Sequence, residues 1–128
     1  MNYNNLTQRY FDGAQAFAGV LTGPGAFRGS AGSRAQGTWI QFDLRVDPGQ
    51  ARTIQAARFL AYACPHTIAA AAWMAEAAVG TSASAAPPES AQGLRERFAI
   101  PVEKLGRLLV VEDAWNAAVK ACMGSTAG

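Results

Sequence analysis

The chain has 128 residues, half of them hydrophobic, and a net charge of +2. This length predicts a single domain over residues 1–128, with enough apolar side chains for a core. The basic residues are scattered rather than clustered, which disfavours a nucleic-acid partner. No apolar run reaches the roughly 18 residues of a membrane span. Because the first residues also lack a signal-peptide layout, we expect a cytoplasmic protein that is not bound to a membrane.

The N-terminal half predicts one short helix followed by strands. Residues 5–11 are the helix candidate, with Asn4 or Asn5 as its N-cap. The stretch 13–37 holds seven glycines, which excludes further helix there and leaves only an edge strand. Polar and apolar residues then alternate, and an Asp-Pro-Gly-Gln turn joins two strands into an antiparallel hairpin. The expected strands are 26–32, 39–46 and 53–62.

The C-terminal half predicts helices separated by loops. The expected helices are 65–79, 90–98 and 103–122. Pro65 suits the first helical position, and Gly80 is a normal stop. Residues 100–102 are expected to be extended, because a residue before proline avoids the helical region. A loose tail is expected over 123–128. Strands followed by helices predict an α+β fold, with a small three-stranded antiparallel meander and helices packed on one face.

Cys64 is the strongest candidate for a chemical site. It follows a β-type run and directly precedes an alanine-rich helix, so its thiol lies beside the free N–H groups of a helix start. These donors and the helix dipole favour a thiolate, which can serve as a nucleophile, a metal ligand or a sulfur carrier. The alternative is a small cysteine buried as an ordinary apolar residue.

His66, the single histidine of the sequence, lies two residues after Cys64. A Cys-Pro-His turn brings the two side chains within reach, so His66 could tune or deprotonate the thiol. The alternative is a solvated or capping side chain on the first helical turn. Cys64 and Cys122 are too few for a disulfide framework or a self-contained zinc site. We therefore expect two free thiols, with Cys122 incidental.

Three separated segments carry a further signal, namely GTWIQFDLRVDPG, ARFLAYACPHTIAAAAWMAE and IPVEKLGRLLVVEDAWNAA. Their residues, their order and the spacing between them resemble the IscU/NifU N-terminal family of iron–sulfur cluster assembly scaffolds, over residues 10–119. The resemblance implies the SufE/NifU (IscU-like) fold and a bacterial scaffold that binds iron or an iron–sulfur cluster and is not an enzyme. It also implies a cysteine desulfurase or another assembly component as the partner.

The resemblance places the family's ligands on this sequence. The family binds a [2Fe–2S] cluster or a metal ion between three cysteines, with an aspartate and a histidine nearby. Cys64 matches the second cysteine. Gln36 stands at the position of the first cysteine, and Thr38 at that of the aspartate. Gly106 stands at the position of the histidine, and Arg107 at that of the third cysteine. One ligand of the set therefore remains.

This loss argues against a cluster, iron or zinc on a single chain. A [2Fe–2S] cluster takes four protein ligands, mostly thiolates, and a tetrahedral zinc ion takes three or four. Arg107 repels a cation, whereas it can pair with the Cys64 thiolate and lower its pKa. We therefore expect the guanidinium near the thiol. A homodimer that shares a cluster between Cys64 and His66 of each chain is left open.

The segment before the last helix is a candidate for partner binding. It partly matches a Leu-Pro-Pro-Val-Lys stretch that a dedicated chaperone recognises in the related scaffolds. The candidate residues are Ile100, Pro101, Val102, Glu103 and Lys104. The alternative is a plain extended entry into the helix.

Three functions fit these observations. The favoured one is an iron–sulfur assembly protein of scaffold type, degenerate in cluster ligation, that binds partners and accepts sulfur at Cys64. The second is a non-catalytic interaction or regulatory protein that has kept the fold. The third is a small thiol enzyme that uses Cys64, His66 and Arg107.

Overall fold

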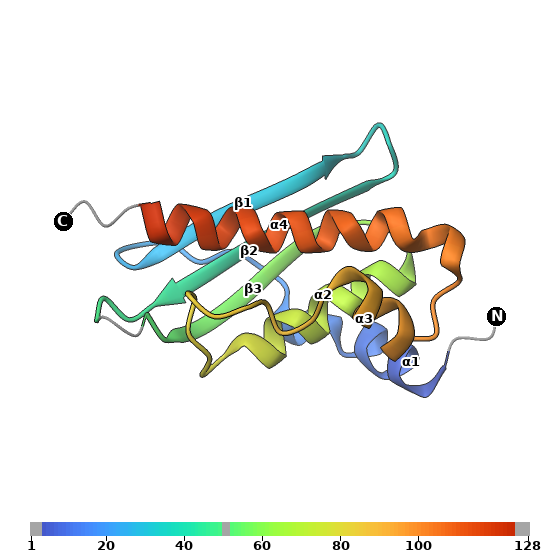
Figure 1. Ribbon diagram of the computed structural model, residues 1–128, viewed down its shortest axis with the longest axis horizontal. Coiled ribbons are helices and arrows are strands. Elements are labelled where there is room, and N and C mark those ends of the chain that lie inside the picture. The colour runs from blue at the N-terminus through green and yellow to red at the C-terminus, as the bar shows by residue number, and fades with distance from the viewer. Residues whose placement is uncertain (1–3, 50–51, 125–128) are drawn as a thin grey trace.

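The computed structural model describes residues 4–49 and 52–124 and shows an α+β fold (Figure 1). The elements in chain order are α1 (Asn5–Asp12), η1 (Ala14–Phe17), β1 (Ala26–Ser33), β2 (Thr38–Val46), β3 (Ile54–Tyr62), α2 (Pro65–Ala78), α3 (Ala91–Arg97), η2 (Val102–Lys104) and α4 (Leu105–Gly124). Here α denotes an α-helix, η a 3₁₀ helix and β a strand. The strands come together in the chain and most helices follow them, which confirms the predicted fold class.

The three strands form an antiparallel meander in the order β1-β2-β3. The alternation along β2 places Ile40, Phe42 and Leu44 on one face, where all three side chains are fully buried. Helix α4 packs across β1 and β2, and α2 packs against β3, so the two helices cover the same face (Figure 1). The core lies between this face and the two helices.

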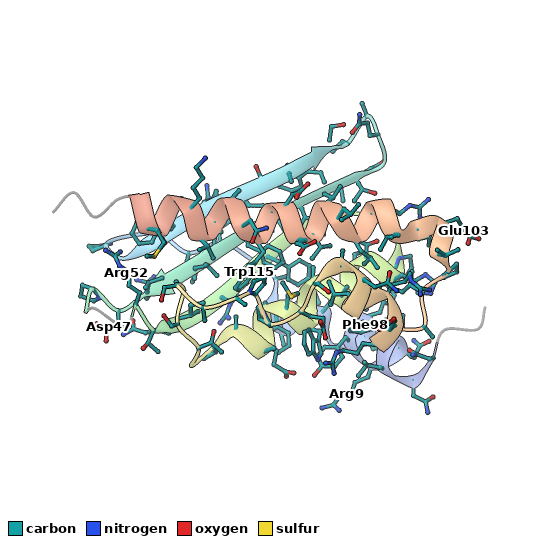
Figure 2. The ribbon with its side chains drawn as sticks, viewed as in Figure 1. Arg9, Asp47, Arg52, Phe98, Glu103 and Trp115 are labelled. Carbon is teal, nitrogen blue, oxygen red and sulfur yellow. The ribbon has the colours of Figure 1, made fainter. Side chains whose placement is uncertain are left out.

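Close packing fixes α4 on the sheet. Figure 2 shows Trp115 reaching from α4 into the interior, where its ring meets Phe42 edge to face at 5.1 Å between centroids. Gly29 of β1 faces the same helix, and a Cβ at this position would overlap the backbone of Ala117 and Ala118. The glycine therefore allows β1 and α4 to approach more closely than any side chain would.

Polar caps set the helix ends that the sequence predicts. The Asn4 side chain accepts a hydrogen bond from the Thr7 N–H at 2.7 Å, and Ser90 caps α3 in the same way. Gly80, just beyond α2, has a φ of 92°, a conformation that favours glycine. No helix among the described residues combines the length and apolar character that crossing a membrane requires.

Several local expectations are wrong. Residues 14–17 form the 3₁₀ helix η1 inside the glycine-rich stretch, because this segment lies between Gly13 and Gly19 and contains no glycine itself. Val102 is not extended but opens η2, where Lys104 N–H bonds back to the Pro101 carbonyl. The last helix consequently begins two residues later than expected. It also continues through residues 123–124, while Gln50 and residues 125–128 lie outside the described residues.

Candidate functional site

Three segments meet at one end of the sheet (Figure 1). They are the β1–β2 turn, the junction between β3 and α2, and the segment that leads through η2 into α4. A hollow of about 230 Å³ lies between the first and the third of these segments. It is lined by Gln36, Thr38, Glu103, Gly106, Arg107 and Val110. Gln36, Thr38, Gly106 and Arg107, the four positions that the resemblance matched to missing ligands, are thus neighbours in space.

Cys64 occupies the N-cap of α2 because of its two flanking elements. Strand β3 ends at Tyr62, and Pro65 takes the first helical position and keeps the preceding residue extended, with φ −74° and ψ 164° at Cys64. The side chain is half-buried and its thiol is free. The Thr67 hydroxyl lies 3.3 Å from Cys64 Sγ. The thiol therefore lies beside the Thr67 hydroxyl of the first helical turn, and the Cys64 side chain makes no N-cap hydrogen bond to a backbone N–H.

The surroundings of Cys64 stabilise its thiolate. Burial raises the pKa of the Cys64 thiol, but hydrogen bonds from the Thr67 hydroxyl and backbone N–H lower it. A hydrogen bond from the Arg107 guanidinium and the charge of Lys104 lower it further. The net effect is a pKa below that of an ordinary cysteine. The close approach of the guanidinium to the thiol stays a prediction.

His66 is buried, with 7% of its surface exposed. Lys104 Nζ lies 3.1 Å from His66 Nδ1. Because an ammonium only donates hydrogen bonds, Nδ1 is the acceptor and the ring proton sits on Nε2. Burial and the charges of Lys104 and Arg107 lower the pKa of His66, so the ring is neutral near pH 7. The alternative of a solvated side chain is wrong, whereas proton transfer with Cys64 stays a prediction.

The donor set does not fit a metal ion or a cluster on one chain. No group of three His, Cys, Asp or Glu side chains lies close enough to hold a metal within residues 4–49 and 52–124. The sequence contains only one cysteine besides Cys64, namely Cys122, which is buried in the last turns of α4 and contacts Arg52. The site instead places two cations next to the thiol.

The segment proposed for partner binding is divided between the core and the surface. Ile100 is buried, while Pro101, Val102 and Glu103 are exposed, with 65% of Val102 accessible. Figure 2 shows Glu103 at the outer end of this segment. Lys104 turns inward to His66. A role in partner binding stays a prediction, and its surface is limited to the three exposed residues.

Two members of the site were not predicted in their observed roles. Thr67 stands three residues after the N-cap, the spacing at which capping side chains interact, so the Cys-x-x-Thr pattern was an available signal. Lys104 was expected only as a partner contact. Its pairing with His66 joins residues 38 positions apart, and no local pattern indicates it.

Fold and site together define a class: a small α+β domain with one activated thiol at the end of an antiparallel sheet. The family described as NifU-like N terminal domain matches residues 2–127, and the chain belongs to this family. A solved structure of a nitrogen-fixing NifU-like protein (N-terminal) from Brucella abortus is similar, with a TM-score of 0.71 and 15% identity. The match covers 95% of this chain and 94% of the other.

Two more solved structures are similar. A putative iron–sulfur cluster assembly scaffold protein for the SUF system from Fervidobacterium islandicum AW-1 has a TM-score of 0.52 and 15% identity, over 94% of this chain and 88% of its own. A hypothetical protein has a TM-score of 0.55 and 20% identity, over 94% and 98%. At such identities the likeness shows the fold alone. No curated protein matches the chain.

Proposed function

We propose that this chain is a scaffold-type component of iron–sulfur cluster assembly that accepts sulfur at Cys64 and holds no cluster on a single chain. Membership of the NifU-like family supports the assembly role. The observation that carries the rest is the Cys64 thiol, whose pKa is lowered by Thr67, Arg107 and Lys104. Arg107 stands at the position that the family resemblance assigns to a further cysteine. A cationic group at this place disfavours iron and favours an anionic sulfur species.

The proposed step is the transfer of one sulfur atom from a cysteine desulfurase. The Cys64 thiolate attacks the outer sulfur of a persulfide on the desulfurase. The S–S bond of that persulfide breaks, the desulfurase thiolate leaves with the electron pair, and a new S–S bond forms on Cys64. One S–S bond replaces another and the transferred sulfur keeps its oxidation level, so the step needs no oxidant or reductant. The chain is in this account a sulfur acceptor rather than an enzyme.

The test is the intact mass of the protein after incubation with a cysteine desulfurase and cysteine. We expect the wild type to gain one sulfur atom, which a thiol reductant removes. Cys64→Ser should gain none, and Cys122→Ala, which keeps the proposed acceptor, should behave like the wild type. A wild-type chain that gains no sulfur, or that gains it equally in Cys64→Ser, would contradict the proposal.

The second candidate is a non-catalytic interaction protein that has kept the fold. The loss of the ligand set favours it, because a surface for partners does not depend on metal ligands. Both candidates predict binding to an assembly component, and they differ at Cys64. Binding that Cys64→Ser leaves intact, without sulfur transfer in the wild type, would favour the interaction protein.

A further inference from the structure

The sheet has an outer face, which looks away from α2 and α4. Segment 18–25 covers the part of this face farther from the β1–β2 turn, and in Figure 1 it passes behind the strands. The Leu21 N–H donates to the Asp43 carboxylate at 2.8 Å, and the Arg45 guanidinium donates to the Thr22 carbonyl at 2.9 Å. These contacts fix the segment over one part of the outer face and leave the part near the turn uncovered by it.

Arg34 and two aromatic rings form this uncovered part of the outer face. Trp39 and Tyr62 are cross-strand partners on β2 and β3, and 52% of Tyr62 is exposed. The Arg34 guanidinium, from the β1–β2 turn, lies 5.6 Å from the centroid of the Trp39 ring and 5.9 Å from that of the Tyr62 ring. Both rings therefore hold the guanidinium by cation–π contacts. We call these three residues the arginine–aromatic patch.

Arg34 can bind a carboxylate of a partner. The ion pairs within residues 4–49 and 52–124 join Arg28 to Asp43 and Arg97 to Glu89, so no carboxylate of this part of the chain pairs with Arg34. A guanidinium presents a planar fork of donors that binds a carboxylate through two hydrogen bonds. Because the two rings already hold this guanidinium in place, binding costs little side-chain entropy.

The charge of the sheet favours an acidic partner. Residues 26–62 carry five arginines and two aspartates, and one of these aspartates, Asp43, is buried and bound by Arg28. The rest of the chain carries six cationic and seven acidic residues. The net positive charge therefore resides in the segment that forms the sheet. A second copy of the chain would bring like charges together on this face, whereas a partner with carboxylates would be attracted.

An apolar hollow adjoins the patch at the edge of β3. It measures about 210 Å³, and the residues that line it include Ala14, Ala18, Leu60 and Ile68. Leu60 stands two positions before Tyr62 on the same side of β3, so the hollow and the patch are neighbours. Small-molecule sites measure about 300–1,000 Å³, and this smaller hollow suits one apolar side chain of a protein.

We propose that the arginine–aromatic patch and this hollow dock the protein that delivers sulfur to Cys64. The matching surface of that protein presents a carboxylate to Arg34 and an apolar side chain to the hollow. The inference rests on the proposed function, because it names the surface that the sulfur donor of that function uses. Tyr62 is two residues from Cys64, so a protein docked on the patch lies beside the thiol. Tyrosine, tryptophan and arginine are also the residues that contribute most to protein interfaces.

The affinity for a cysteine desulfurase, measured by titration calorimetry, tests the inference. Arg34→Gln should weaken binding about tenfold, because it removes a charge-assisted contact. Tyr62→Ser should weaken it by about the same factor. Arg9→Gln is the matched control and should leave the affinity unchanged. Arg9 is also exposed and lies 5.4 Å from the centroid of a tyrosine ring, but it belongs to α1 in the helical layer. An unchanged affinity in Arg34→Gln would overturn the inference.

The kinetics of sulfur transfer separate docking from activation of the thiol. In Arg34→Gln, the desulfurase concentration that gives half the maximal transfer rate should rise about tenfold, while the rate at saturation stays unchanged. Alkylation of Cys64 by iodoacetamide should also stay unchanged. A lower saturating rate or slower alkylation would show that Arg34 acts on the thiol, and would overturn the docking role.

The docking surface and the proposed function can fail separately. Sulfur transfer at limiting desulfurase that is equally fast in the wild type and Arg34→Gln would overturn the docking surface and leave the proposed function standing. Desulfurase binding that depends on Arg34, without sulfur on Cys64, would support the surface and contradict sulfur acceptance. A wild type that neither binds the desulfurase nor accepts sulfur would overturn both.

Discussion

The Lys104 ammonium lies 3.1 Å from Nδ1 of the buried His66 ring and joins the end of η2 to the first turn of α2. The contact occupies Nδ1, keeps the imidazole neutral and holds a cation within reach of the Cys64 thiol. Because Lys104 engages Nδ1, this ring nitrogen does not present its lone pair to a metal ion.

The first prediction concerns the acidity of Cys64. Alkylation by iodoacetamide should rise with pH about a midpoint below the ordinary cysteine value of about 8.5, because Thr67, Arg107 and Lys104 favour the thiolate. Arg107→Gln should raise this midpoint, and Lys120→Gln should not. The measurement is the alkylation rate against pH in the Cys122→Ala background, where one thiol remains. A wild-type midpoint at or above the ordinary value would contradict the description of the site.

The second prediction concerns pH and stability. The pKa of His66 is lowered in the folded chain, so between that pKa and the ordinary value of about 6.5 the unfolded chain binds more protons. Stability should therefore fall as the pH drops below about 6.5 and level off below the folded-state pKa. Urea midpoints measured at about pH 7.5 and pH 5.5 for the wild type and His66→Gln isolate this effect. An equal loss of stability in both proteins would show that His66 does not carry it.

Residues whose roles depend on local pattern could be predicted from the sequence. Alternation in β2 predicted the strand, and the Cys-Pro step predicted the N-cap at the start of α2. The effect of Arg107 on the pKa of Cys64 could be predicted only through the family resemblance, because no local rule connects residues so far apart. The pairing of Lys104 with His66 depends on how α4 docks against α2, and nothing in either segment alone specifies that docking.

The glycines also show how far a local sequence pattern can predict the structure. Glycine density predicted that the stretch 13–37 lacks helix, but η1 forms over four of the five residues between Gly13 and Gly19. The density of a stretch says little about the spacing within it. Nor does the sequence reveal why Gly29 must be glycine, since the reason is the backbone of α4 passing over β1.

The third prediction tests the close approach of α4 to β1 at Gly29. Gly29→Ala should destabilise the fold by about 1–3 kcal/mol or more, because its Cβ would meet backbone atoms of Ala117 and Ala118 that cannot turn aside. Gly106→Ala is the matched control, since nothing lies within 4 Å of a Cβ there. It should stabilise the chain by up to about 1 kcal/mol through helix propensity. Chemical denaturation measures both changes, and equal stabilities would contradict the packing of α4 on β1.

The fourth prediction concerns metal binding. The wild type should bind neither zinc nor iron in stoichiometric amount, because its site lacks ligands. A double variant, Gln36→Cys with Arg107→Cys, should gain tight zinc binding. It adds two thiolates at positions that line one hollow and removes one cation. Adding Cys64→Ser to this variant should abolish the gain. Equilibrium dialysis with metal analysis is the measurement, and zinc bound equally by the wild type would contradict the account.

The most direct test of the central claim is a native mass spectrum of the chain after anaerobic incubation with a cysteine desulfurase, cysteine and ferrous iron. The account predicts one added sulfur atom, its loss in Cys64→Ser, and no iron. A stoichiometric iron–sulfur cluster on the wild type that Cys64→Ser abolishes would contradict it, because ligands beyond those of one chain would then complete a working scaffold.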